Sequence, residues 1–277
     1  MVFSSSYHAA PRHSTVDRSH SHGVDAMSHH IVEVRDLRYT YPGGNQALSG
    51  VSFRITHGEA VAIVGANGAG KSTLLLHLNG CLMPEAGIVR VGDFPLTKKT
   101  LPYIRRTVGM VFQNPDDQLF MPKVYDDVAF GPLNMGLPPE DVEGKVMSAL
   151  AIVGAAHLKD RPPYRLSEGE KRSVAIASVL SMSPSILIMD EPTSSLDPKA
   201  RRELINLLQT FEHTIIIATH DLDMVLDICS RTIILKDGRV EVDGLTEEIL
   251  QNEKLLASSH LEKPLRLQGC PVCNAKV

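Results

Sequence analysis

The sequence predicts an α/β fold with a core of parallel strands, an antiparallel β subdomain and an inserted helical subdomain. Continuous apolar runs are typical of buried parallel strands, and such runs lie at 61–64, 186–189 and 214–218. Alternating apolar and polar residues at 31–34 and 51–55 predict half-exposed strands of the second, antiparallel unit. Between about 116 and 182, apolar residues recur at helical spacing, which predicts the helical subdomain.

The first 30 residues differ from the rest of the chain. They hold six of the twelve histidines and no periodic apolar pattern, so we expect a disordered tail over 1–30. Met27 stands just before the first strand-like run and is an alternative start of the protein. Histidine is a common ligand of nickel, cobalt and zinc, but an affinity leader has the same composition, so both explanations stay open. The histidines of the tail are His8, His13, His20, His22, His29 and His30.

The overall composition excludes several classes of function. A formal net charge of −4 gives no broad basic surface, so we predict no nucleic-acid partner. Four cysteines without a disulfide framework favour a reducing compartment. No apolar run approaches the roughly 20 residues that cross a bilayer, and the chain does not begin with the apolar segment of a secretory signal. We therefore expect a cytoplasmic protein whose membrane path, if it serves transport, belongs to other chains.

A glycine-rich loop follows the apolar run 61–64 and leads into a helical segment at 74–79. The loop matches the full phosphate-loop pattern, in its required context of a buried strand before and a helix after. Backbone N–H groups of such a loop wrap a phosphate, Lys71 would reach the β- and γ-phosphates, and the Ser72 hydroxyl would bind Mg²⁺. The sequence therefore predicts a P-loop NTPase core that binds ATP and Mg²⁺, with a chance glycine-rich turn as the alternative. The loop comprises Gly65, Ala66, Asn67, Gly68, Ala69, Gly70, Lys71, Ser72 and Thr73.

The apolar run 186–189 ends in two consecutive carboxylates, Asp190 and Glu191. A buried strand that ends in a carboxylate places Asp190 beside the Mg²⁺ of a phosphate loop. Glu191 can then reach a water in line with the γ-phosphate, so it is the candidate general base. The alternative is an acidic strand end that only caps the following turn.

Two strands and a helix close the core domain, which we place at 31–248. Segments 231–236 and 239–242 flank Asp237 and Gly238, which is a hairpin pattern. Thr246 is then predicted to cap the N-terminus of a helix through about Leu256. The remaining C-terminal extension, 249–277, contains half of a zinc-type site, which would need a dimer partner or a histidine such as His260. Its cysteines are Cys270 and Cys273.

A set of motifs in the middle of the chain indicates a family. Leu166-Ser167-Glu168-Gly169-Glu170 resembles the LSGGQ signature of ATP-binding cassette (ABC) proteins, about 20 residues before the strand that ends at Asp190. Gln113 resembles the family's Q-loop glutamine, 195–197 its D-loop and His220 its switch histidine. Tyr41, 30 residues before Lys71, resembles the aromatic residue that stacks on adenine. These motifs follow the family's order from about residue 31 to 245; singly, Gln113, His220 and Tyr41 would be ordinary surface or core residues.

The resemblance implies a mechanism in a dimer. Two cassettes of this family pack head to tail, so that each ATP lies between one phosphate loop and the partner's signature. Ser167 and Gly169 are accordingly expected to contact the γ-phosphate from across the interface, at the positive end of the helix that begins near Glu170. Gln113 would sense Mg²⁺ and the attacking water, and His220 would hold Glu191 and that water in place.

One residue departs from the family's signature. Glu168 replaces the usual third-position glycine, and a carboxylate near a γ-phosphate is unfavourable unless it points away or is paired. Lys171 and Arg172 are expected to neutralise it. A related branch of the family also carries Glu170 in place of glutamine, so that change alters the expectation less.

Several stretches resemble one branch of the ABC family more closely. Those at 39–44, 113–120 and 126–132 are similar to the ATPases of energy-coupling-factor importers, with the best likeness to the cobalt and nickel branch. The resemblance implies a homodimer or heterodimer of ATPase subunits on a transmembrane coupling protein, beside a membrane subunit that binds the substrate, at the cytoplasmic face of the cell (inner) membrane. Residues 116–120 and the apolar Leu119, Phe120 and Met121 would line the groove for the coupling protein; the alternative places these apolar residues in the core.

Other functions remain open at this point. Nickel is slightly favoured over cobalt by the histidine tail, and a vitamin importer of the same type is the alternative. A soluble cassette protein of translation or DNA repair usually has two cassettes or a long coiled-coil insertion, neither of which this sequence shows. A non-hydrolysing partner in a heterodimer has Glu168 in its favour, against intact Lys71, Glu191 and His220.

Overall fold

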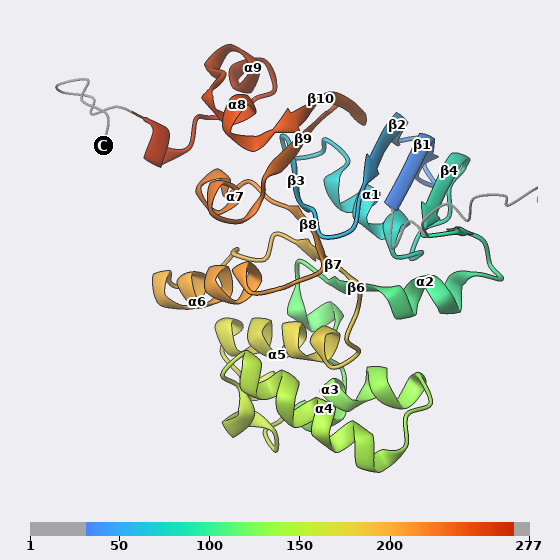
Figure 1. Cartoon of the computed structure of the whole chain (residues 1–277), viewed down its shortest axis with the longest axis vertical. Coiled ribbons are helices and arrows are strands. Elements are labelled where there is room, and N and C mark those ends of the chain that lie inside the picture. The colour runs from blue at the N-terminus through green and yellow to red at the C-terminus, as the bar shows by residue number, and fades with distance from the viewer. Residues whose placement is uncertain (1–31, 269–277) are drawn as a thin grey trace, which may run out of the picture.

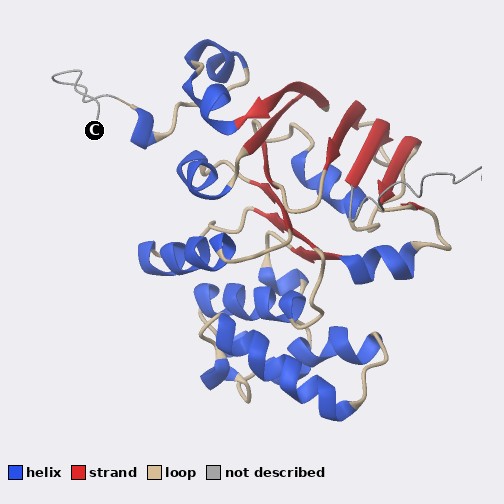
Figure 2. Ribbon diagram, viewed as in Figure 1, coloured by secondary structure: helices blue, strands red, loops and turns tan. Residues whose placement is uncertain are grey.

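The computed structural model describes residues 32–268, which form two β-sheets and several surrounding helices (Figure 1, Figure 2). The strands of the described part are β1 (Val32–Thr40), β2 (Gln46–Ile55), β3 (Ala60–Val64), β4 (Ala86–Val91), β5 (Phe94–Pro95), β6 (Val108–Val111), β7 (Ile186–Asp190), β8 (Thr214–Ala218), β9 (Arg231–Lys236) and β10 (Arg239–Leu245). The α-helices are α1 (Lys71–Leu78), α2 (Leu101–Thr107), α3 (Val124–Asn134), α4 (Pro139–Ile152), α5 (Glu168–Leu180), α6 (Pro198–Gln209), α7 (Leu222–Ile228), α8 (Thr246–Gln251) and α9 (Glu253–Ser258). Short 3₁₀ turns lie at Pro115–Asp117, Ala156–Leu158, Pro163–Arg165 and Leu265–Leu267.

The larger sheet has the strand order β10-β9-β3-β8-β7-β6 and is parallel except at the β9–β10 hairpin. Its central strands β7 and β8 are buried along their whole length, as the continuous apolar runs predict. The strand β3 pairs with β8 on one side and β9 on the other, so the phosphate loop starts from the middle of the sheet. Because the strands are parallel, the residues after β3, β7 and β8 meet at one edge.

The smaller sheet is antiparallel, with the order β2-β1-β4-β5, which confirms the predicted antiparallel subdomain. Its strands extend beyond the alternating segments of the sequence, because β1 continues to Thr40 through an irregularity between Val34 and Leu37. Asp36 in this bulge has a left-handed φ of 45°, so the alternation breaks at this point.

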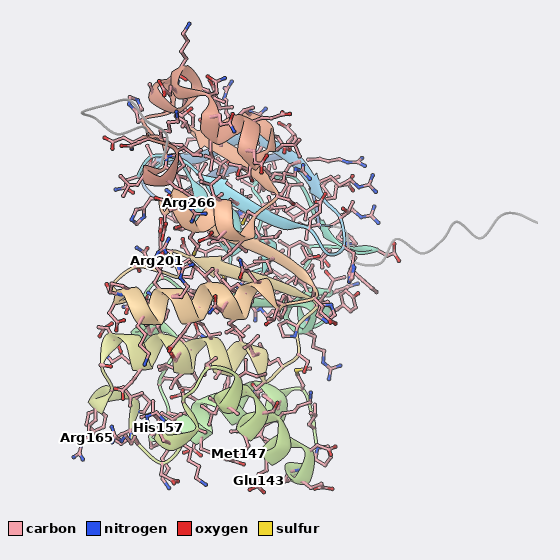
Figure 3. The ribbon with its side chains drawn as sticks, turned by 60° about the vertical axis from the view of Figure 1, so that its left-hand side comes forward. Glu143, Met147, His157, Arg165, Arg201 and Arg266 are labelled. Carbon is pink, nitrogen blue, oxygen red and sulfur yellow. The ribbon has the colours of Figure 1, made fainter. Side chains whose placement is uncertain are left out.

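The helical subdomain consists of α3, α4 and α5, which pack on one another below the sheets in Figure 1. It corresponds to the inserted helical subdomain of the predicted fold class. Glu143 and Met147 of α4 lie at the end of the subdomain away from the sheets (Figure 3). The helix α5 also contacts β6, and so joins the subdomain to the larger sheet.

Two hydrophobic clusters lie on opposite faces of the larger sheet. Side chains of β3 alternate between them: Val61 and Ile63 pack with α1 and the antiparallel sheet, whereas Ala62 and Val64 pack with the helices of the other face. The phosphate-loop strand is therefore held by packing on both faces as well as by both of its neighbours.

The C-terminal part of the domain corrects one prediction. The hairpin is confirmed, with φ values of 48° at Asp237 and 70° at Gly238. Thr246, however, does not cap the helix: its hydroxyl lies 2.8 Å from the buried Thr232 hydroxyl, and Leu245 takes the cap position without a side-chain bond. The expected helix is also interrupted, because the Asn252 side chain accepts a bond from the Leu255 N–H (3.1 Å) and starts α9.

Some predictions lie outside the described residues, namely the histidine-rich tail with Met27 and the cysteines at 270 and 273. Between residues 32 and 268, the structure contains no helix that is long and apolar enough to cross a membrane.

Candidate functional site: a phosphate-loop pocket

The phosphate loop joins β3 to α1 and bends tightly at its first glycine. A β-carbon at Gly65 would lie 2.3 Å from the Leu235 carbonyl oxygen, so only glycine fits there. The Lys71 ammonium donates to the carbonyl oxygens of Gly65 (2.8 Å) and Ala66 (3.2 Å), which holds it over the loop. Gly70 stands at the start of α1 with no side-chain cap, so the first N–H groups of the helix face the loop and can bind an anion.

A pocket of about 330 Å³ brings most of the predicted residues together. Tyr41, the loop residues Asn67 to Thr73, Gln113, Asp190 and Glu191 line it. Asn45, just before β2, and Gln46 and Ala47, at its start, line it as well; sequence reasoning missed them because nothing in that stretch resembles a motif. Gly65 and Ala66 contribute through their bonds to Lys71.

Tyr41 lies at the rim of this pocket and is fixed in orientation. Its hydroxyl is 3.1 Å from the Thr73 hydroxyl, and its ring meets Tyr39 edge-on with centroids 5.0 Å apart. The position suits an aromatic residue beside a nucleotide; stacking on adenine stays a prediction.

Asp190 is the most deeply buried carboxylate of the pocket, with 5% of its surface exposed. Burial raises the pKa of Asp190, while a hydrogen bond from Ser72 acts in the opposite direction. Its Oδ1 is buried and has no hydrogen-bond partner. A buried carboxylate oxygen without a donor, next to a serine hydroxyl and with Gln113 lining the same pocket, fits the oxygen ligands of Mg²⁺.

Glu191 follows Asp190 with a left-handed φ of 46°, and one oxygen of its carboxylate is held by two neighbouring residues. Oε2 lies 2.8 Å from Nδ1 of His220, accepts from the Thr219 hydroxyl (3.1 Å) and accepts from the His220 N–H (3.3 Å). His220 itself is 69% exposed at the end of β8. The expected contact between Glu191 and His220 is thus present, and Thr219 is a further anchor that the sequence did not indicate.

The signature residues lie away from this pocket, at the start of α5. Ser167 is the helix N-cap and forms a capping box with Glu170, whose pKa is lowered by the hydrogen bonds from Ser167. The helix therefore begins at Glu168, slightly earlier than expected. Ser167 is exposed and Gly169 has open space around its α-carbon, so a group from outside the chain can approach both.

Glu168 is paired, as expected, but with one of the two proposed partners. Lys171 Nζ lies 3.2 Å from its carboxylate and 2.8 Å from that of Asp116. Arg172 turns away and donates to backbone carbonyls of the segment around Gln113. The negative charge at this signature position is thus balanced by Lys171.

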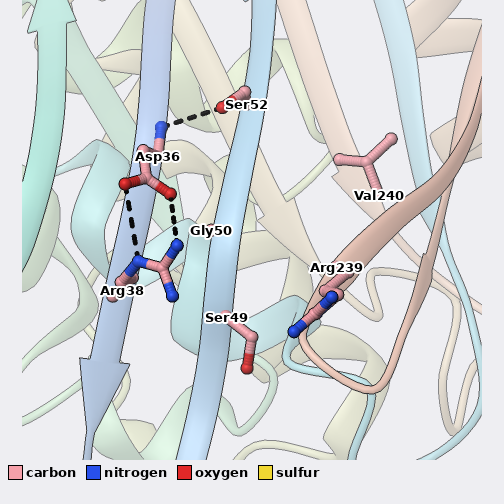
Figure 4. Close-up of a pocket in the computed structure, with 7 residues that line it drawn as sticks. All are labelled: Asp36, Arg38, Ser49, Gly50, Ser52, Arg239 and Val240. Atoms are coloured by element: carbon pink, nitrogen blue, oxygen red, sulfur yellow. Dashed lines mark hydrogen bonds and ion pairs between the residues drawn. The ribbon is translucent and has the colours of Figure 1, made fainter.

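A second depression, of about 420 Å³, lies between the antiparallel sheet and the β9–β10 hairpin (Figure 4). Asp36 accepts from Arg38 (2.9 Å), and Arg239 approaches from the hairpin. The Asp36 and Arg38 side chains are 64% and 47% exposed and neutralise each other. No predicted site residue lines this depression, and we assign it no function.

The family to which this chain belongs, found by comparison with known proteins, is consistent with the phosphate-loop pocket described above. A family model described as ABC transporter matches residues 48–194. The chain belongs to the ABC transporter family, as an ATP-binding protein.

Two relatives are similar to this chain over most of its length. A putative ABC transporter ATP-binding protein of Geobacter sulfurreducens is 67% identical over 247 residues, which cover 89% of this chain and 99% of that protein. The energy-coupling factor transporter ATP-binding protein EcfA of Methanocaldococcus jannaschii is 44% identical over 252 residues, 89% of this chain and 90% of that protein.

Solved structures share the same fold. CbiO1 of Clostridium perfringens, described as part of the ABC transporter complex CbiONQ, matches with a TM-score of 0.72 and 42% identity over 83% of this chain and 94% of that one. A dimeric ATP-binding cassette with bound ADP and phosphate matches with a TM-score of 0.71 and 29% identity, over 78% of this chain and 98% of that one. ATPase domains of this family bind ATP, hydrolyse it in transporters and act as dimers.

Proposed function

We propose that this chain is the ATP-hydrolysing subunit that energises an energy-coupling-factor importer for nickel or cobalt ions. The observation that carries the catalytic part is the Glu191 carboxylate, which His220 and Thr219 hold at the edge of the phosphate-loop pocket. The likeness to EcfA and to a subunit of a CbiONQ complex supports the importer type. In this proposal the chain is bound peripherally at the cytoplasmic face of the cell (inner) membrane.

Within the pocket, each residue has a distinct role. Backbone N–H groups of 65–73 and the Lys71 ammonium bind the phosphates of ATP. Ser72, Gln113 and Asp190 would hold Mg²⁺, which when bound neutralises charge on the β- and γ-phosphates. Glu191 accepts a proton from the attacking water, and His220 orients the Glu191 carboxylate.

The site is completed by a second cassette. Ser167 and Gly169 lie outside the chain's own pocket, so they serve the ATP of the partner in a head-to-tail dimer. The N-terminal end of α5, with Ser167 as its cap, directs the positive end of the helix dipole at the partner's γ-phosphate. The partner is either a second copy or a homologous subunit.

An apolar patch after Gln113 in sequence, on α3 and the segment before it, suits a membrane partner. Phe120, Phe130 and Leu133 are 63%, 41% and 51% exposed, and the two rings meet edge-on with centroids 5.0 Å apart. Of the three apolar residues expected in the groove, Leu119 is only 7% exposed and belongs to the core, Met121 is half-buried, and Phe120 is exposed. We propose that this patch receives the transmembrane coupling protein.

The patch can be tested by co-purification with the transmembrane coupling protein and the substrate-binding subunit. Phe120→Ser should weaken recovery of the membrane subunits and leave the ATPase of the isolated chain unchanged. Phe94→Ser is the matched control, because Phe94 is 39% exposed on the antiparallel sheet. Equal recovery of the membrane subunits with the wild type, Phe120→Ser and Phe94→Ser would refute the docking surface.

Transport itself is tested by uptake of radiolabelled nickel and cobalt in cells with and without the gene. Loss of uptake on deletion identifies the ion. Unchanged uptake of both ions, together with loss of vitamin uptake, would favour the vitamin-importer alternative.

A further inference from the structure

We propose that Arg172 and Lys171 form an α5 clamp that couples the two ATP sites of the dimer. The inference rests on the head-to-tail dimer of the proposed function. The clamp ties the helix that serves the partner's ATP to two loops that serve the chain's own ATP. Its residues lie directly after the signature, and neither of them lines the pocket or belongs to the patch.

Arg172 is buried, with 3% of its surface exposed, yet no carboxylate within the described residues forms an ion pair with it. Its guanidinium instead donates to the carbonyl oxygens of Phe112 (2.9 Å) and Gln113 (2.7 Å). The same group donates to the Ser194 hydroxyl at 3.1 Å. Glu168 and Asp190 act on this charge only at longer range, and all of its hydrogen bonds go to acceptors of two loops. Such a charge has a specific positioning role, since an apolar side chain would fill the space without the cost of desolvation.

The contact to Ser194 continues to the catalytic strand end. The Ser194 hydroxyl donates to the Glu191 carbonyl oxygen at 2.9 Å, so Arg172 is two hydrogen bonds from the candidate base. On the other side, the Gln113 carbonyl that Arg172 binds belongs to a residue that lines the pocket. One guanidinium thus fixes both the Q-loop and the loop after Glu191.

Lys171 adds a second contact between the same elements. Its ammonium joins Asp116 (2.8 Å) to Glu168 (3.2 Å), and its side chain is only 12% exposed. Asp116 lies three residues after Gln113, and Glu168 is the first residue of α5. The unusual glutamate of the signature therefore takes part in the clamp.

The consequence follows from the geometry of a head-to-tail pair. The α5 N-terminus can move only with 112–116 and 191–194, because the clamp joins them. When the partner's ATP draws Ser167 and Gly169 across the interface, the clamp also moves Gln113 and the loop after Glu191. These two segments belong to the ATP site of the chain that carries the clamp. The planar guanidinium of Arg172 reaches three acceptors in two loops at once, whereas a lysine ammonium donates from a single nitrogen, so we expect lysine to replace Arg172 only in part.

Mixed dimers, purified through two different tags, test this coupling. A dimer of one Arg172→Met protomer and one wild-type protomer is expected to retain well below half of the wild-type ATPase, because both sites lose alignment. Retention of half of the activity would overturn the coupling, since one site would then act alone. Arg35→Met is the matched control, because the Arg35 side chain is 67% exposed on β1 of the antiparallel sheet; its mixed dimer should keep full activity.

A second set of variants guards against simple misfolding. Arg172→Met homodimers should lose at least about tenfold in kcat with the KM for ATP unchanged within about twofold, while Ser194→Ala and Arg172→Lys should be intermediate. Amide hydrogen exchange should speed up in 112–116 and 191–196 but not in β3. Wild-type exchange in both segments of Arg172→Met would refute the clamp, whatever the ATPase result. An inactive wild-type protein would contradict the proposed hydrolysis and leave this exchange test intact.

Discussion

Replacing Glu191 with glutamine tests the proposed catalytic base most directly. The amide oxygen can keep the acceptor roles toward the Thr219 hydroxyl and the His220 N–H, which now span 3.1 and 3.3 Å. The change therefore removes the negative charge and the ability to accept a proton, with little change of shape. We expect Glu191→Gln to fold and to bind Mg-ATP.

The expected magnitude separates a catalytic role from a structural one. The contact between Glu191 and His220 involves an imidazole that is 69% exposed, so as an ion pair it contributes at most about 1 kcal/mol. Its loss would lower the rate by no more than about fivefold. Loss of a general base lowers the rate by about 100- to 10,000-fold, equivalent to about 2.7–5.5 kcal/mol of transition-state stabilisation.

Phosphate release under saturating Mg-ATP measures the effect, with nucleotide binding followed separately. Glu203→Gln on α6 is a matched control, because Glu203 is 66% exposed and its removal should leave turnover unchanged. Retention by Glu191→Gln of more than about a tenth of the wild-type rate would refute the assignment of Glu191 as the base.

Two further changes address the metal ligand and the helical subdomain. Burial raises the pKa of Asp190, so without Mg²⁺ the folded protein loses stability as the pH rises from the ordinary carboxyl range through this raised value. Asp190→Asn should therefore be more stable than wild type at neutral pH in EDTA, by about 1.4 kcal/mol for each unit by which the pKa is raised. Equal melting temperatures of the two proteins would contradict this. Leu150→Ala should lower the free energy of unfolding by about 3–5 kcal/mol in a denaturant titration, because Leu150 is fully buried. The control is Ile152→Ala on the same helix: Ile152 is 53% exposed, so this change should lower the free energy of unfolding by less than about 1 kcal/mol.

The main elements of the fold could be predicted because the apolar pattern of each segment alone indicates how that segment is buried. Fully buried strands such as β7 and β8 appear as continuous apolar runs, and β8 has the predicted bounds. Boundaries set by distant contacts could not be predicted. The Thr246 hydroxyl pairs with Thr232 of the neighbouring strand, and a residue preference for helix caps carries no information about that partner.

The site shows the same difference between features predicted from one segment and features set by distant contacts. The phosphate-loop residues form one continuous stretch, and so do the two carboxylates at the end of β7, so each motif predicts its own position. Thr219 and Arg172 act through bonds to residues 28 and 60 positions away, respectively, and neither has a local pattern that would reveal it. Gln113 became a site residue only through the family resemblance, which the pocket geometry then supports.

The left-handed backbone of Glu191 has a consequence for how this protein can change over generations. A φ of 46° at a residue with a β-carbon costs about 1–3 kcal/mol, which glycine would relieve and asparagine would reduce. Selection for thermal robustness alone would therefore disfavour glutamate at this position. Under the proposed role of Glu191 as the base, the chain gives up stability for activity at this position, so libraries selected only for folding should accumulate inactive variants there.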